Sequence, residues 1–185
     1  GFPAYTYGTN LGAQSNKSIT TVNIIDSAKI TNDLKRYREM GAELIIVYFH
    51  FGNEYQRLEN NYQRKTEAIA LKAGADIIIA SHPHVIQPVR FYSDSSANID
   101  TGFTAYSLGN FISNQRWRYS DCGVIINFSI SRPDTSRKFS LGKVKYLPVW
   151  IYKGNTGKNR EYKIIPQNFK EELYPSYLSK TDSSA

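Results

Sequence analysis

The sequence lacks the residues for a disulfide and for a membrane span. Cys122 is the only cysteine among 185 residues, so no disulfide can form within the chain. No run approaches the roughly 20 apolar residues that a transmembrane helix needs. The first residues, Gly1-Phe2-Pro3, have neither the basic nor the apolar stretch of a signal peptide. These absences leave the cellular compartment open, and we interpret Cys122 as a small buried apolar residue.

Acidic residues are fewer than basic ones, which gives the chain a formal net charge of +7. A positive surplus raises the affinity for polyanions in general without selecting one of them. No motif that reads RNA or DNA accompanies this charge, so we expect no nucleic-acid partner. Arg116 and Arg118 flank Trp117. An arginine there is either a clamp for a phosphate or carboxylate group or a solvated charge that packs on Trp117.

The composition is that of a folded protein rather than a disordered one. Hydrophobic residues make up 41% of the chain, which includes 14 tyrosines. The length fits one domain over residues 1–185, with a loose polar tail at 179–185. The chain begins with Gly1 rather than Met, so we expect it to be a piece of a longer protein.

The first half of the chain alternates between strand and helix patterns. We expect strands at 20–25, 43–50 and 76–82. A helix begins after an N-cap at Asp26 or Ser27 and ends at Gly41. A second helix covers 61–73, and its buried side is predicted from the apolar pattern. That side comprises Tyr62, Ile69 and Ala73.

The second half reads mainly as strands separated by turns. Strand candidates lie at 85–92, 103–108, 123–131, 141–152 and 162–165, and a short helix is expected at 169–178. The predicted fold class is therefore mixed α/β, in which a β-α-β-α-β unit is followed by antiparallel strands.

The three histidines are the main chemical signal. His50 and His82 each end an apolar strand-like run, and His82 follows His50 by 32 positions, which fits one β-α-β unit. Ligands in such sheets bind beyond the carboxyl ends of the parallel strands. His84 lies two positions after His82, and in an extended backbone both imidazoles face the same side. We predict a site for divalent Mn, Fe or Zn ions formed by His50, His82 and His84.

Two polar residues are candidates for chemistry beside the histidines. Glu54 lies in the loop after His50, where it is a metal ligand, a general acid or base, an orienter of an imidazole, or a solvated carboxylate. Asn110 follows Gly109 after another strand, and its amide either reaches a substrate oxygen or belongs to a plain turn. Gly109 is expected to serve backbone geometry in either case.

Four blocks of the sequence resemble the CapA-type capsule synthesis family, in the family's order, within about residues 19–128. The blocks are His50-Phe51-Gly52-Asn53-Glu54-Tyr55, Gly74-Ala75-Asp76, Ser81-His82-Pro83-His84-Val85 with Gln87-Pro88, and Tyr106-Ser107-Leu108-Gly109-Asn110-Phe111. Phe51 and Ala80 stand where the family usually has Trp and Gly.

The resemblance implies a calcineurin-like metallophosphatase fold, with this chain as the carboxyl-terminal half of a β-sandwich flanked by helices. It implies that His50 and His82 bind one metal and that His84 binds or adjoins a second. The family's opening Asp- and Asn-bearing motifs do not occur in residues 1–16. Either the chain is a carboxyl-terminal part, or a partner chain such as a second copy supplies the other half.

The resemblance also implies a role in poly-γ-glutamate capsule production at the cell envelope, outside the cytoplasm. Two functions fit that role. One is a metal-dependent hydrolase of a phosphoester or related bond, with Glu54 and Asn110 near the substrate. The other is a non-catalytic envelope protein that binds or guides an anionic capsule polymer such as poly-γ-glutamate.

Overall fold

The computed structural model describes residues 1–9, 22–94, 97–133, 137–155, 160–167 and 178. The helices are α1 (Ser27–Glu39) and α2 (Asn61–Lys72). The strands of the first half are β1 (Ala4–Thr6), β2 (Ile46–His50), β3 (Ile77–Ser81), β4 (Val89–Tyr92) and β5 (Gly102–Ala105). Those of the second half are β6 (Cys122–Asn127), β7 (Ile130–Ser131), β8 (Ser140–Leu141), β9 (Lys145–Asn155) and β10 (Arg160–Pro166).

A five-stranded sheet with the order β1-β2-β3-β5-β4 forms the centre of the protein. β1, β2, β3 and β5 run parallel, and only β4 pairs antiparallel with its neighbour. The helices α1 and α2 connect successive parallel strands. The predicted β-α-β-α-β unit followed by antiparallel strands is therefore confirmed, as is the mixed α/β class.

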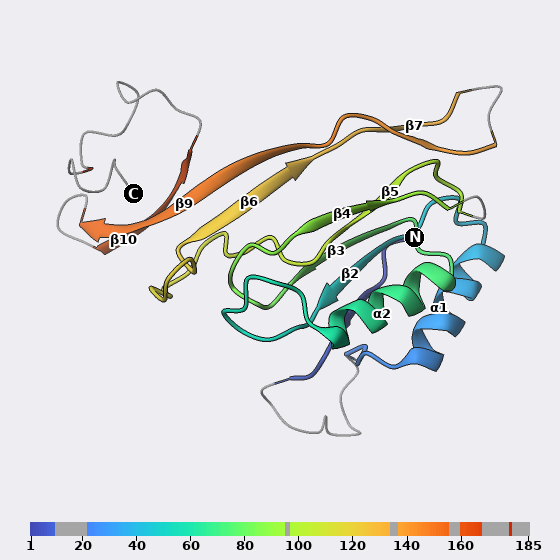
Figure 1. Cartoon of the computed structure of the whole chain (residues 1–185), viewed down its shortest axis with the longest axis horizontal. Helices are drawn as coiled ribbons and strands as arrows, with labels where there is room; N and C mark the ends of the chain where they lie inside the picture. Colours follow the sequence, from blue (N-terminus) through green and yellow to red (C-terminus); the bar gives the residue numbers. More distant parts are fainter. Residues whose placement is uncertain (10–21, 95–96, 134–136, 156–159, 168–177, 179–185) are drawn as a thin grey trace.

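Both faces of the central sheet are covered over much of their area, which is why its inner strands are nearly continuous apolar runs. Figure 1 shows α1 and α2 on one side of the sheet and the long ribbon of β6 and β9 on the other. The helix side buries residues such as Leu34, Phe49 and Ile78. The opposite side buries Ile77 and Phe103, with residues of β6, β7 and β8 packed against them.

Local signals fix the ends of both helices. The side chain of Asp26 caps α1 by accepting a hydrogen bond from the Lys29 backbone N–H at 2.7 Å. Asn60 and Gln63 form a reciprocal capping box at the start of α2. Gly41 and Gly74 follow the helices with φ angles of 88° and 100°, a backbone conformation that glycine adopts without strain.

The second half forms antiparallel sheets, as predicted. β9 pairs with both β6 and β10 in a three-stranded sheet, and β7 pairs with β8. The backbone of Val124 donates to the carbonyl of Leu108 at 2.9 Å, which joins β6 to the loop after β5. This connection holds the loop containing Asn110 at the end of the central sheet.

Several predicted elements differ from the observed ones. The first strand of the sheet is β1, which the sequence analysis missed, whereas the described part of 20–25 contributes only an isolated bridge between Ile24 and Thr6. Tyr62 is 45% exposed, so its predicted burial is wrong. The buried positions of α2 are Gln63, Thr66 and Ala70, because capping and hydrogen bonding turn a polar stripe toward the core.

Two other predictions fall on residues outside the described ranges, namely the helix at 169–178, apart from residue 178, and the tail at 179–185. The assignment of residues 1–185 to one domain stays a prediction. In the described part of the chain, neither helix combines the length and apolar character that crossing a membrane requires.

Candidate metal centre

Three neighbouring parallel strands end at the same edge of the central sheet and bring three rings together. Thr6 of β1 pairs with His50 of β2, and His50 pairs with Ser81 of β3. The ring centroids of His50 and His82 are 4.7 Å apart. Tyr7, which follows β1, places its ring centroid 4.4 Å from that of His82. The predicted convergence of His50 and His82 at the strand ends is thus present in the structure.

A tight turn, rather than an extended segment, carries His82 and His84. Their φ angles are 110° and 60°, in a region that non-glycine residues rarely adopt. The expectation of an extended backbone was wrong, because the chain must reverse direction after β3 while Pro83 keeps its own φ near −65°. The two imidazoles still share one side, with ring centroids 5.9 Å apart. Strained backbone of this kind is characteristic of functional sites.

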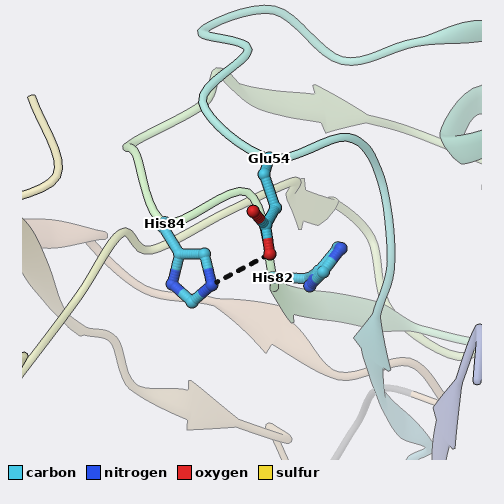
Figure 2. A group of neighbouring side chains, drawn as sticks. All are labelled: Glu54, His82 and His84. Carbon is cyan, nitrogen blue, oxygen red and sulfur yellow. Dashed lines mark ion pairs between the residues drawn. The ribbon is translucent and has the colours of Figure 1, made fainter. Parts of the chain in front are cut away.

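The loop after β2 brings Glu54 against the histidine turn. The backbone N–H of Tyr55 donates to the carbonyl of Pro83 at 2.8 Å and fastens the two loops together. Figure 2 shows the Glu54 carboxylate pointing between the rings of His82 and His84. Its Oε1 lies 3.7 Å from Nε2 of His84. The ligand atoms of Glu54, His82 and His84 all lie within 4.8 Å of one another.

Buried amides hold the Glu54 loop in place. Gln87 donates from Nε2 to the carbonyls of Gln56 and Leu58, at 2.8 and 3.1 Å. Its Oε1 accepts from Nε2 of the fully buried Gln63 at 2.8 Å. At Gly52, where φ is 104°, a Cβ atom would lie 2.7 Å from the Gln63 side chain. The loop therefore needs glycine at this position to approach α2 so closely.

Asn110 determines which nitrogen of His84 faces the cluster. The amide Nδ2 of Asn110 donates to the Ser120 carbonyl at 2.7 Å, so its Oδ1 is the atom that lies 2.9 Å from His84 Nδ1. An amide oxygen only accepts, so Nδ1 carries the proton and Nε2 of the neutral ring keeps its lone pair toward Glu54. Gly109 permits this arrangement, because a Cβ there would lie 2.6 Å from the Cys122 carbonyl oxygen.

Burial keeps two of the imidazoles in their neutral form. Desolvation lowers the pKa of His50, and the nearby His84 lowers it further. Desolvation, followed by the proximity of His50, also lowers the pKa of His82. A depressed pKa leaves the ring neutral at neutral pH, which is the form that binds metals. Nδ1 of His50 also lies 3.5 Å from the Ser81 hydroxyl, which in turn contacts the Tyr48 hydroxyl.

The donor set at this edge fits a divalent cation. Two ligands bound at roughly 2.1 Å in tetrahedral geometry are about 3.4 Å apart. The separation of 3.7 Å between Glu54 and His84 is close to that value, and the largest spacing, up to 4.8 Å, requires only a small closure. Two imidazoles and one carboxylate suit Zn, Fe or Mn. Within the described ranges, this is the one cluster of histidine, cysteine and acidic residues with such spacing.

Sequence comparison assigns the chain to a known family. The profile of the family described as "Bacterial capsule synthesis protein PGA_cap" matches residues 1–115, more than half of the chain. The chain belongs to this family. The matched residues include His50, Glu54, His82 and His84, which we call the histidine cluster, and also Asn110. The family match therefore covers the whole candidate site.

Two capsule-related proteins of Bacillus are similar to this chain. The "PGA biosynthesis protein CapA" of Bacillus subtilis (strain 168) is 32% identical over 96 residues, which are 52% of this chain and 23% of that protein. The "Capsule biosynthesis protein CapA" of Bacillus anthracis is 33% identical over 89 residues, which are 48% of this chain and 20% of that protein. The matches therefore span about a fifth of the length of these relatives.

In this PGA_cap family chain, the group with metal-ligand spacing is Glu54, His82 and His84, whereas His50 lies beside His82 and outside that group. The structure also adds one residue to the site. His50, His82, His84, Glu54 and Asn110 all lie at one edge of the sheet. Tyr7 was missed, although it directly follows β1 at the sheet edge where His50 and His82 lie.

The remaining candidates lie as follows. Arg118 packs on the ring of Tyr119 rather than on Trp117, while Arg116 donates to the carbonyls of Ser113 and Gln115. Cys122 is partly buried, and burial raises the pKa of its thiol to about 11. A thiol with this pKa is a poor nucleophile, in keeping with its interpretation as a structural residue.

Proposed function

We propose that this chain is part of a capsule biosynthesis protein that hydrolyses a phosphoester or related bond with the help of a divalent cation. The observation that carries the proposal is the cluster of Glu54, His82 and His84, whose ligand atoms lie within 4.8 Å of one another. Burial favours the neutral form of His82, and the Asn110 contact orients His84, so both imidazoles are prepared for a cation.

Each residue has a distinct role in this proposal. His82 and His84 hold the cation, and Asn110 positions His84. Glu54 is either the third ligand or the group that accepts and returns a proton, since its side chain is 48% exposed and reaches open solvent. When bound, the cation polarises a phosphoryl or acyl oxygen and lowers the pKa of a water molecule.

A dinuclear centre belongs to the same proposal. His50 lies beside His82 rather than within the group of three, so it is available to a second cation next to the first. Further donors for that cation would have to join His50. The metallophosphatase fold that the sequence resemblance implies supports this version, because phosphatases with two-metal sites are common.

The alternative is a non-catalytic protein that binds or guides an anionic capsule polymer. The net charge of +7 favours it, as do the exposed arginines near the cluster. The names of the relatives refer to PGA biosynthesis and capsule biosynthesis, which suits either function and supports a location at the cell envelope.

Metal dependence separates the two functions. The experiment measures bound metal and the hydrolysis of a model phosphoester in the full-length protein and in its His84→Asn variant. The proposal expects a stoichiometric divalent metal and hydrolysis that the substitution abolishes. Poly-γ-glutamate binding that survives both chelation and His50→Ala, without any hydrolysis, would instead establish the binding function.

A further inference from the structure

A hollow bordered by aromatic and basic residues lies next to the histidine cluster. We call this hollow the rim groove. It is lined by Tyr55, Arg57, Trp117, Arg118 and Tyr119. Its volume is about 310 Å³. It adjoins the cluster through Tyr55, whose ring centroid lies 6.1 Å from that of His84 and 6.1 Å from that of Trp117. A molecule in the rim groove would therefore extend to the candidate metal centre.

Two positive charges in the rim groove share one aromatic ring. The guanidinium carbon of Arg57 lies 4.4 Å from the ring centroid of Tyr119, and that of Arg118 lies 4.9 Å from the same centroid. Cation–π contact holds each group in place, but the two like charges repel each other. Among the described residues, no carboxylate forms an ion pair with either arginine. Both arginines line the rim groove, so an oxyanion bound there would compensate their positive charge.

Backbone strain marks the rim groove and the histidine cluster as one region. In the described part of the chain, four non-glycine residues have a positive φ. His82 and His84 are in the cluster, and Tyr55 and Tyr119 are in the rim groove, with φ angles of 62° and 69°. Such strain persists where the surrounding structure enforces a functional arrangement. Its restriction to these two adjacent places favours a single extended site.

We infer that the rim groove is an anion subsite, in which Arg57 and Arg118 bind a carboxylate or phosphate group of the same substrate that reaches the Glu54–His82–His84 cluster. The inference rests on the proposed function for the identity of that substrate as an acidic chain. The exposed ring of Trp117 provides the apolar wall against which the chain between successive anionic groups packs. The subsite thus selects substrates that carry a second oxyanion beside the reacting group.

Tryptophan fluorescence provides a direct test on the 185-residue chain. Trp150→Phe leaves Trp117 as its sole tryptophan. The probes are a γ-linked oligoglutamate and inorganic tripolyphosphate, titrated separately at low salt. Comparison of the two titrations distinguishes a carboxylate ligand from a phosphate ligand. We expect a saturable change in Trp117 emission with at least one probe. Calorimetry on the chain with Trp150 intact gives the same affinity without relying on that substitution.

Two double variants with the same loss of charge distinguish the subsite from general attraction. Arg57→Gln with Arg118→Gln should weaken binding at least tenfold, as expected for loss of charge-assisted bonds. Arg36→Gln with Arg132→Gln is the control, since Arg36 is exposed on α1 and Arg132 also lies over an aromatic ring, that of Phe139. The control should weaken binding less than about twofold. Equal weakening by both pairs, or no binding of either probe, would overturn the inference.

Chelation separates this inference from the proposed function. With EDTA, or in His84→Asn, we expect each probe that binds the original chain to bind the rim groove within about twofold of its original affinity. Loss of binding under these conditions would show that the cation, not the arginine pair, holds the anion, and would overturn the subsite alone. If the full-length protein bound the probes but contained no metal and hydrolysed no phosphoester, the hydrolase proposal would be refuted and the subsite would be retained.

Discussion

Ionisable side chains lie at both ends of the central sheet, but the two ends differ in how many hydrogen-bond and ion-pair partners these side chains have. At the amino end of β3, Asp76 is fully buried and forms an ion pair with Arg38 at 2.6 Å. At the carboxyl end, the ligand atoms of Glu54, His82 and His84 lie within 4.8 Å of one another. The comparison separates an ion pair that stabilises the fold from the group of residues that we propose as a cation site.

Every oxygen of Asp76 has a donor. Oδ2 accepts from Arg38 and from the backbone N–H of Ile45 at 2.7 Å, and Oδ1 accepts from the backbone N–H of Asn98 at 3.2 Å. These bonds tie α1, β2 and the segment before β5 to the start of β3. The carboxylate is fully compensated, so no further partner is needed.

The carboxyl end shows the opposite state. The Nε2 lone pair of His84 faces the Glu54 carboxylate, so two acceptors lie 3.7 Å apart without a hydrogen between them while His84 is neutral. His82 and His84 also keep a costly backbone conformation there. In the proposed function, a cation between Glu54 and His84 accounts for their approach.

The largest predicted effect is on stability, at the amino end. Asp76→Ala should lower the free energy of unfolding by about 3–5 kcal/mol, because it leaves the Arg38 charge and two backbone donors unpaired. Urea denaturation measures the change. If Asp76→Ala lost less than about 1 kcal/mol, the assignment of this end to stability would be wrong.

The next effect is on metal affinity, at the carboxyl end. His84→Asn should raise the dissociation constant for Mn²⁺ by at least about 100-fold, because it removes one of three ligands and loss of an outer partner alone costs roughly 10–100-fold. Asparagine tolerates the φ of 60°, so the metal-free protein should keep its stability within about 1 kcal/mol. Calorimetric titration and urea denaturation measure the two quantities. A large loss of stability would assign His84 to the fold instead.

A smaller effect is expected at the partner of that histidine. Asn110→Ala should weaken Mn²⁺ binding about tenfold, because the hydrogen bond that orients His84 is lost. Asn110→Asp keeps an acceptor for His84 Nδ1 but loses the donor to the Ser120 carbonyl, so it separates the two contacts of Asn110; its Mn²⁺ affinity should stay above that of Asn110→Ala. Equal weakening in both variants would mean that Asn110 does not act through His84.

The smallest effect concerns an exposed charge away from both ends of the sheet. Glu39→Ala removes a surface ion pair with Lys35, whose atoms are 3.8 Å apart. It should change the free energy of unfolding by less than about 0.5 kcal/mol and leave metal affinity unchanged. An effect comparable to that of Asp76→Ala in the same urea experiment would remove the distinction between buried and exposed charges on which the comparison depends.

The sequence predicted the convergence of the histidines because strand order and direction follow from the β-α-β pattern. His50 and His82 end apolar runs of the right spacing, and Gly41 and Gly74 mark the helix ends. The turn at His82-Pro83-His84 was not predictable, since tertiary packing imposes its positive φ angles. β1 is only three residues long and carries a weak pattern, so Tyr7 escaped notice. The burial of Gln63 depends on partners distant in sequence, as do the contacts of Arg57 with Tyr119.

The central claim is that Glu54, His82 and His84 bind one divalent cation together. X-ray absorption at the zinc edge tests it most directly, on the 185-residue chain with one equivalent of Zn²⁺ and on its His84→Asn variant. The account predicts at least two imidazole nitrogens at roughly 2.0–2.1 Å and a carboxylate oxygen in the original chain, with one imidazole fewer or no bound zinc in the variant. Zinc without imidazole ligands, or spectra identical in the two proteins, would contradict it.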